Sequence, residues 1–245
     1  MGDFFLFLAM VLAIGAFFNT QEILGINSLI KPLKFAVSTS VYAYSFGYLF
    51  YYVENQKAVK RFSILAIIVM LYENGVIVVQ ALRGTRSHFN QLTIVGGILY
   101  AIMGIMIVWV TIATLVIAIR FIIQKTYSIP QPFVVAIQIA LIVFVVFSFF
   151  GGYMSKINTH TVGGEMGGSG LPFFNWSNLL GDLRVAHFFG IHALQLIPFF
   201  GFAISKQVSD TKKATLYVWL FSIVYVCFVC FTAYQALSAQ PFIAY

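Results

Sequence analysis

The stretch FVVAIQIALIVFVVFSFFG, residues 133–151, runs for nineteen residues without a single Asp, Glu, Lys or Arg. A helix needs about 20 mostly apolar residues to cross the hydrocarbon core of a bilayer. The whole chain of 245 residues is 61% hydrophobic and 9% charged, whereas soluble domains are about 25% charged. The sequence therefore predicts an integral membrane protein.

Six other apolar segments are similar to this one in length and composition. Together they give seven predicted spans, at residues 4–18, 35–53, 62–82, 92–120, 133–151, 185–204 and 214–237. The first carries Asp3 and no early basic residue, so we interpret it as a retained helix and not as a secretory signal. Pro198 is expected to kink the sixth span. The predicted fold is all-α, a single transmembrane domain over residues 1–245.

The distribution of basic residues predicts the orientation of this bundle. Seven spans place the two termini on opposite sides, and the Lys and Arg residues divide eight against six between the two sets of connections. By the positive-inside rule, the richer set and the N-terminus are cytoplasmic and the C-terminus is outside. This topology explains the formal net charge of +7 without a nucleic-acid partner.

The longest connection, residues 152–184, lies on the predicted outer side. Loops of more than about 15 residues without structure of their own are usually functional or disordered. This one contains Phe173, Phe174 and Trp176, so we expect it to fold back over the bundle as a cap. Its segment GGEMGGSG (163–170) lacks the ending of a phosphate-binding loop and is interpreted as a hinge.

Polar side chains are expected to form a layer below the outer surface. Glu73 lies about 14 Å below the outer end of the third span, and His192 lies about 10 Å below that of the sixth. A lone buried carboxylate would cost several kcal/mol, and an ionisable residue inside a span indicates a functional site by default. We therefore expect His192 to pair with Glu73. The alternative is a polar clamp between the two helices.

All four histidines lie in the outer half of the predicted bundle. A non-haem metal needs histidine or carboxylate ligands that converge from different segments. The candidate ligands of a divalent metal, zinc or copper, are His88, His160, His187 and His192. His187 and His192 are about 140° apart around their helix, so they do not form a single-helix site.

The other polar residues complete this predicted site. Glu73 or Asp182 would act as general base, and Lys34 and Arg184 would bind an anionic head group or pair with Asp182. Asn74 and Gln195 would lie beside the substrate. The leading interpretation is a membrane-embedded metal-dependent enzyme that acts on a lipid or another amphiphile, with membrane lipids as its surroundings and partners.

Two other functions stay open. A haem b would take His88 with His187 or His192 as axial ligands, which would make the chain a haem-binding or quinone-linked redox protein. Its propionates would be held by Arg83, Arg86 and Arg184, and room for its ring would come from Gly96, Gly97 and Gly190. A transporter or receptor would instead use Glu73 and His192.

Three features leave further questions open. Cys227 and Cys230 form a CxxC pair, which is either redox-active or simply two small residues of an apolar helix. The sequence Asn175-Trp176-Ser177 fits a glycosylation site. The chain is compatible with a homo-oligomer or with a subunit of a membrane complex.

Five polar segments carry a resemblance to a known family. They are KPLKF (31–35), RGTRSHFN (83–90), HTVGG (160–164), GSGLPFFNWS (168–177) and GDLRVAHFFGIHALQ (181–195). In this order they resemble a family of uncharacterised bacterial integral membrane proteins. The resemblance implies a location in the bacterial inner membrane, and all five segments lie on the outer side of the predicted topology.

Overall fold

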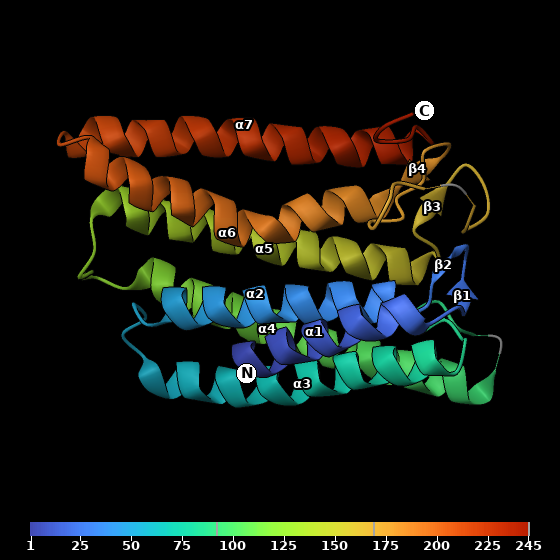
Figure 1. Cartoon of the computed structure of the whole chain (residues 1–245). Coiled ribbons are helices and arrows are strands. Elements are labelled where there is room, and N and C mark those ends of the chain that lie inside the picture. The colour runs from blue at the N-terminus through green and yellow to red at the C-terminus, as the bar shows by residue number, and fades with distance from the viewer. Residues whose placement is uncertain (92, 169, 245) are drawn as a thin grey trace.

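The computed structural model describes residues 1–91, 93–168 and 170–244, and these residues form a bundle of seven helices with two small hairpins (Figure 1). In chain order the elements are α1 (Gly2–Phe18), β1 (Glu22–Ile23), β2 (Ile26–Asn27), α2 (Ile30–Phe50), α3 (Gln56–Leu82), α4 (Ile94–Ile123), α5 (Gln131–Lys156), β3 (Thr161–Val162), β4 (Gly181–Asp182), α6 (Leu183–Gln207) and α7 (Thr211–Leu237). The first residue of the predicted span 92–120 and Ser169 of the predicted hinge lie outside the described residues.

The prediction of an all-α integral membrane protein is confirmed. Five of the described helices, α3 to α7, are long and apolar enough to cross a membrane. The helix α1 is apolar but has 17 residues, and α2 is the more polar one because Lys31, Lys34 and the run 38–40 occupy its first half. Crossing by all seven helices stays a prediction.

Side-chain caps explain why four of the helices begin where they do. The side chain of the residue before each helix accepts a hydrogen bond from a backbone N–H of its first turn, which would otherwise lack a partner. These capping residues are Asn55 for α3, Thr93 for α4, Asp182 for α6 and Asp210 for α7. The helix α5 instead begins directly after Pro130 and carries Pro132 in its first turn, where a missing N–H costs least.

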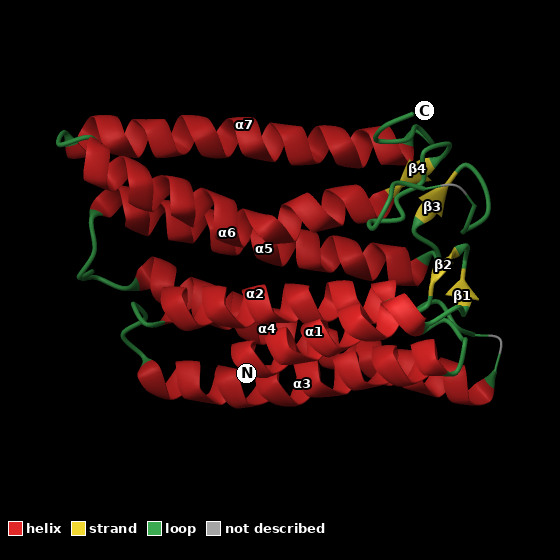
Figure 2. Ribbon diagram, in the orientation of Figure 1, coloured by secondary structure: helices red, strands yellow, loops and turns green. Residues whose placement is uncertain are grey.

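Both hairpins lie at one end of the bundle, together with the C-terminus (Figure 2). The strands β1 and β2 pair antiparallel through a turn at Leu24 and Gly25, both at positive φ, which is the backbone that a two-residue hairpin requires. The strands β3 and β4 also pair antiparallel and bring the two ends of the 157–182 connection together. We call this end of the molecule the loop-rich end.

The helices form two groups. The backbones approach closely within α1–α2–α3 and within α5–α6–α7, and α4 packs on both α3 and α5. The α5–α6 contact is tight at Gly190, where an added Cβ would lie 2.1 Å from Cγ of Phe147. The helix α6 contains Pro198 and bends along its length (Figure 1), as expected for a proline that removes a helical hydrogen bond.

The start of α1 differs from the expected position. Ser40 of α2 donates a hydrogen bond to the carbonyl of Gly2 at 3.0 Å, and the Tyr44 hydroxyl bonds the carboxylate of Asp3. Ser40 lies about 15 Å along α2 from the loop-rich end, so the N-terminus lies beside the middle of α2 (Figure 1). The structure therefore does not place this terminus at the end of the bundle that was predicted to be cytoplasmic.

Candidate functional site

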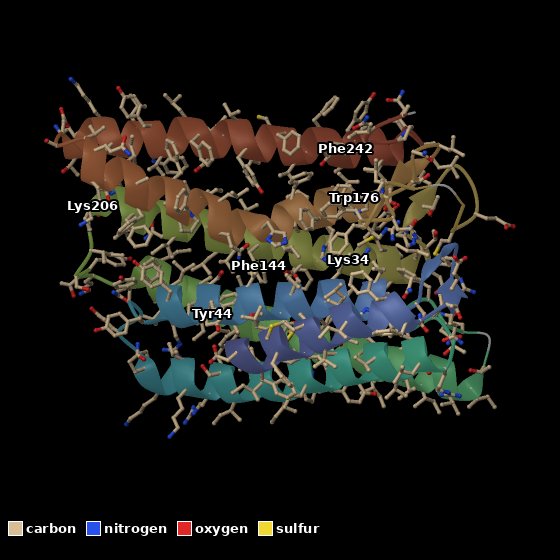
Figure 3. All side chains as sticks on the ribbon, in the orientation of Figure 1. Lys34, Tyr44, Phe144, Trp176, Lys206 and Phe242 are labelled. Atoms are coloured by element: carbon tan, nitrogen blue, oxygen red, sulfur yellow. The ribbon has the colours of Figure 1, made fainter. Side chains whose placement is uncertain are left out.

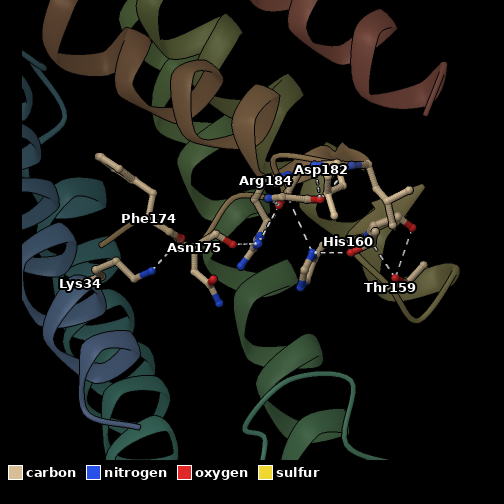
Figure 4. Close-up of polar contacts among 11 residues, drawn as sticks. Lys34, Thr159, His160, Phe174, Asn175, Asp182 and Arg184 are labelled. Carbon is tan, nitrogen blue, oxygen red and sulfur yellow. Dashed lines mark hydrogen bonds and ion pairs between the residues drawn. The ribbon is translucent and has the colours of Figure 1, made fainter. Parts of the chain in front are cut away.

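The carboxylate of Asp182 is the centre of the loop-rich end (Figure 4). It is 1% exposed and accepts four hydrogen bonds. Arg184 donates Nη2 to Oδ2 at 2.6 Å, and its Nε and backbone N to Oδ1 at 2.9 and 3.0 Å. The backbone N–H of Ser177 donates to Oδ2 at 3.0 Å. With both oxygens occupied, the predicted role of Asp182 as a general base does not fit this geometry.

The pairing of Arg184 with Asp182, one of the two roles expected for this arginine, is what the structure shows. Burial alone would raise the pKa of the Asp182 carboxyl, but the hydrogen bonds and the charge of Arg184 outweigh burial and lower it. Arg184 also donates from Nη2 to the carbonyl of Asn175. The guanidinium therefore ties the start of α6 to the cap.

His160 lies beside this ion pair and stays neutral. Its Nδ1 lies 3.2 Å from Oγ1 of Thr161 and 3.7 Å from Oδ1 of Asp182. Burial, followed by the charge of Arg184, lowers the pKa of His160 from 6.5 to about 3. A neutral imidazole is the form that can pack against the Phe89 ring, 5.9 Å away, without the cost of a buried charge.

The cap is held down at two points. Lys34 of α2 donates from Nζ to the carbonyl of Phe174 at 2.9 Å. Trp176 is 7% exposed, stacks on Phe174 at 4.5 Å and meets Phe188 of α6 edge-on at 5.4 Å. Figure 3 shows Trp176 close to Phe242 of the C-terminal segment. Lys34 thus holds the cap, where the sequence had predicted a contact with substrate or with Asp182.

A second polar group lies on the α2–α4 side of the same end. We call Lys31, Glu73 and His88 the inner cluster. The ring of Phe35 lies 5.6 Å from the His88 ring and 5.8 Å from Nζ of Lys31, and Lys31 interacts electrostatically with both Glu73 and His88. Burial among these groups, reinforced by the charge of Lys31, holds the pKa of His88 well below its usual range.

Glu73 is the unsatisfied member of the inner cluster. It is 6% exposed, and its Oε1 has no hydrogen-bond partner among the described residues. Within those residues the salt bridges are confined to Asp182 with Arg184 and His160, so Lys31 and Glu73 share a site without forming an ion pair.

The predicted pairing of Glu73 with His192 is wrong. His192 places Nδ1 2.9 Å from Oε1 of Gln195, and Gln195 donates from Nε2 to Oγ of Ser45 on α2 at 2.8 Å. His192 and Gln195 therefore form a clamp between α6 and α2. The two depths estimated from the sequence were similar, but the side chains face different neighbours.

Asn74, predicted beside the substrate, forms another clamp. It is 3% exposed and donates from Nδ2 to Oγ1 of Thr39 at 3.0 Å and to the carbonyl of Met70 at 2.9 Å. Its hydrogen bonds connect α3 with α2, and they keep a buried amide satisfied.

An open cavity of about 820 Å³ lies at the loop-rich end. We call it the outer mouth. It is lined by Glu22, Ile23, Leu24, Gln80, Arg83, Gly84, Thr85, Arg86, Asn90, Thr93, Thr159, Gly164, Glu165 and Met166. Arg83 donates to Gln80 at 3.1 Å, and Arg86 interacts electrostatically with Lys31 below. Of the three arginines predicted to hold an anion, Arg83 and Arg86 line the mouth and Arg184 does not.

The four histidines do not converge as metal ligands. Among the described residues, no group of three or more His, Cys, Asp or Glu side chains could hold a metal ion. His187, the remaining one, has its Nδ1 2.7 Å from the carbonyl of Phe147. The metal-dependent reaction stays a prediction without an assembled set of ligands.

The space expected for a haem ring is also partly filled. A Cβ at Gly190 would meet the Phe147 ring, and a Cβ at Gly96 would lie 2.8 Å from the Asn90 side chain. Only Gly97, of the three glycines predicted to leave room, has open space beside it. Cys227 and Cys230 are unpaired and lie on the exposed side of α7.

Two residues of this site were missed in the sequence. Lys31 precedes the predicted span 35–53, although it stands in the first turn of α2. Gln80, 2% exposed, lies seven residues after Glu73, and this spacing places both on one face of a helix. The heptad spacing of two polar residues in an apolar helix was the signal that could have identified Gln80.

Comparison with known proteins gives no relative for this arrangement. No family model, no curated protein and no solved structure matches the chain.

The Asp182–Arg184 pair predicts a pattern of stability changes. Replacing Arg184 with Gln leaves a buried carboxylate without its partner, which we expect to cost about 3 kcal/mol, the lower end for a buried pair, because the Arg184 side chain is 30% exposed. The double variant Asp182→Asn/Arg184→Gln removes the charge and keeps a helix cap, so it should be more stable than Arg184→Gln. Thermal unfolding in detergent, followed by circular dichroism, measures both; strictly additive losses would contradict the pairing.

The neutral state of His160 predicts a loss of stability in acid. Below pH 6.5 the unfolded chain takes up a proton that the folded chain refuses until about pH 3, so the free energy of unfolding falls as the pH falls through this window. The expected slope from His160 is up to about 1.4 kcal/mol per pH unit. Unfolding temperatures between pH 7.5 and 5.5 should fall less steeply in His160→Gln than in the wild type. An equal slope in both proteins would refute this assignment.

Proposed function

We propose that the chain is a membrane receptor or transporter whose loop-rich end binds the head group of a lipid or another amphiphile. The observation that carries the proposal is the buried Glu73, whose Oε1 has no partner among the described residues while Lys31 shares its site without pairing. Of the functions considered from the sequence, this one uses the groups that the structure leaves available.

Glu73 and Lys31 are both costly to bury. An ionised side chain away from water is expensive unless it is paired and hydrogen-bonded. Natural proteins keep such groups in a membrane mainly where they serve a substrate or ion pathway. The buried side chains of Asn74, Gln195 and His192 all have hydrogen-bond partners. Oε1 of Glu73 has none among the described residues. A bound ligand would supply the missing partner.

The charges of the site define the ligand that would fit. Lys31 and the mouth arginines Arg83 and Arg86 offer donors to an anion, and Glu73 offers an acceptor to an N–H or O–H group. Gln80 of the outer mouth lies about 10 Å above Glu73 along α3. The head group that matches both ends carries an anion and a donor a few bonds apart, as phosphoethanolamine does.

The location of the site supports the same proposal. The outer mouth opens at the loop-rich end, and the apolar surfaces of α3 and α4 beside it are long enough to face lipid. We infer that α2 to α7 cross a bacterial inner membrane with the loop-rich end outside. The distribution of basic residues supports this orientation, and α2, with 21 residues, spans about 31 Å, enough for a bilayer core.

The ligand proposal predicts a preference between two soluble probes. O-phosphoethanolamine keeps N–H donors for Glu73, and phosphocholine has none, so we expect the first to bind at least about tenfold more tightly. Glu73→Gln should abolish this preference, and Lys31→Gln should weaken both probes. Isothermal titration calorimetry on the full chain in detergent measures all six affinities.

The control for these variants is Glu54→Gln, which removes an exposed carboxylate at the opposite end and should change neither affinity. The proposal fails if neither probe binds to the wild type, or if Glu73→Gln keeps the preference.

The orientation predicts which residues a membrane-impermeant maleimide reaches. In a Cys227→Ala/Cys230→Ala background, Gln21→Cys and Glu165→Cys should be labelled on spheroplasts. Lys60→Cys and Lys125→Cys should be labelled only after permeabilisation. Labelling of both Gln21→Cys and Lys60→Cys from outside would show that α2 does not cross. The reverse pattern at all four positions would show that the bundle is inverted.

A further inference from the structure

A second cavity lies at the opposite end of the bundle, between α3 and α4. It has a volume of about 440 Å³. Its lining residues are Asn55, Lys57, Ala58, Arg61, Phe62 and Leu65 on the α3 side and Ala113, Val116, Ile117 and Arg120 on α4. We call it the basal groove. It lies at the opposite end from the outer mouth, and its ligand does not depend on the proposed function.

The polar half of the basal groove carries three cations. Lys57 and Arg61 are four residues apart on α3, a spacing at which like charges on a helix face each other and repel. Arg120 joins them from α4. None of the three forms a salt bridge with a carboxylate of the described chain. The nearby Glu54 accepts a hydrogen bond at Oε1 from the Thr126 hydroxyl at 2.7 Å, so it is committed to the α4–α5 turn.

The other half of the groove is apolar. Phe62 and Ile117 are 5% and 2% exposed and form its floor, and Leu65 and Ala113 line its far part. Leu65 lies nine residues into α3, about 14 Å from the start of this helix. The groove therefore runs from a cationic end, near the membrane surface, to an apolar end within the hydrocarbon region.

This combination selects one class of ligand. A free phosphate would use the cations and leave the apolar half unfilled, whereas a neutral lipid would leave three cations unpaired. Basic pockets between transmembrane helices are known to hold the head groups of anionic lipids, and arginine binds phosphate in a bidentate manner. We propose that the basal groove binds an anionic phospholipid, with its phosphate on Lys57, Arg61 and Arg120 and an acyl chain on Phe62 and Leu65.

The test is native mass spectrometry of the full chain in mild detergent with added lipid. Phosphatidylglycerol should be retained, and phosphatidylcholine with the same acyl chains should not. The variant Lys57→Gln/Arg61→Gln/Arg120→Gln should lose about 100-fold in affinity for phosphatidylglycerol, from about fivefold per cation. The matched control Lys125→Gln/Lys206→Gln/Lys213→Gln removes the same charge from the same end and should bind as the wild type does.

A second variant tests the contribution of the acyl chain separately from that of the head group. Ala113→Phe keeps all three cations and fills the apolar half, so it should weaken the binding of phosphatidylglycerol and leave the affinity for inorganic phosphate unchanged. Equal losses in the two triple variants would overturn the proposal, as would equal retention of both lipids or full displacement of phosphatidylglycerol by millimolar phosphate.

Discussion

The loop-rich end depends on the carboxylate of Asp182. This one group begins α6 as its cap, neutralises Arg184 and accepts the backbone N–H of Ser177. Through Arg184 it also holds the carbonyl of Asn175. The start of α6 and the cap thus share one buried charge. The hairpin of β3 and β4 is only two residue pairs long, too short to be stable alone, and this charge supplies the remaining order.

Polar groups inside the bundle fall into two kinds. Asn74 with Thr39, and His192 with Gln195 and Ser45, are complete hydrogen-bonded clamps. Each clamp provides hydrogen-bond partners that lipid could not provide, and each interhelical hydrogen bond contributes about 1 kcal/mol to helix association. Glu73 belongs to the other kind, because its Oε1 has no hydrogen-bond partner among the described residues and its interaction with Lys31 is electrostatic. The distinction between satisfied and unsatisfied groups separates structural residues from candidates for binding.

The sequence predicts the elements of this fold well because membrane helices are specified by local composition. Each predicted span overlaps one helix, and the larger disagreements, at α2, α3 and α5, arise where polar or small residues flank an apolar run. The pairing of Glu73 with His192 failed for a different reason. The rise per residue gives the depth of a side chain, but its direction around the helix axis depends on which helices are neighbours.

The same dependence on neighbouring elements explains why the surroundings of the histidines and the contacts of the cap could not be predicted from the sequence. Four histidines at one end of a bundle are consistent with a metal site, yet each is held by a nearby oxygen, such as the Phe147 carbonyl for His187. The cap was expected from the length and aromatic content of its loop, and Trp176 indeed packs on α6. That Lys34 would bond a cap carbonyl depends on tertiary distances that no local pattern contains.

The arrangement of the helices in two groups has a mechanical consequence. Between α2 and α6 the side-chain hydrogen bond is that of Gln195 with Ser45, and between α2 and α5 the contacts are aromatic, as between Phe46 and Phe144 at 5.4 Å. Aromatic contacts tolerate sliding, and one hydrogen bond is a weak restraint. A shear of α1–α3 against α5–α7 would therefore break few specific bonds between α2 and either α5 or α6, and it would displace Lys31 and Glu73, on one group, relative to the ion pair of Asp182 and Arg184 on the other.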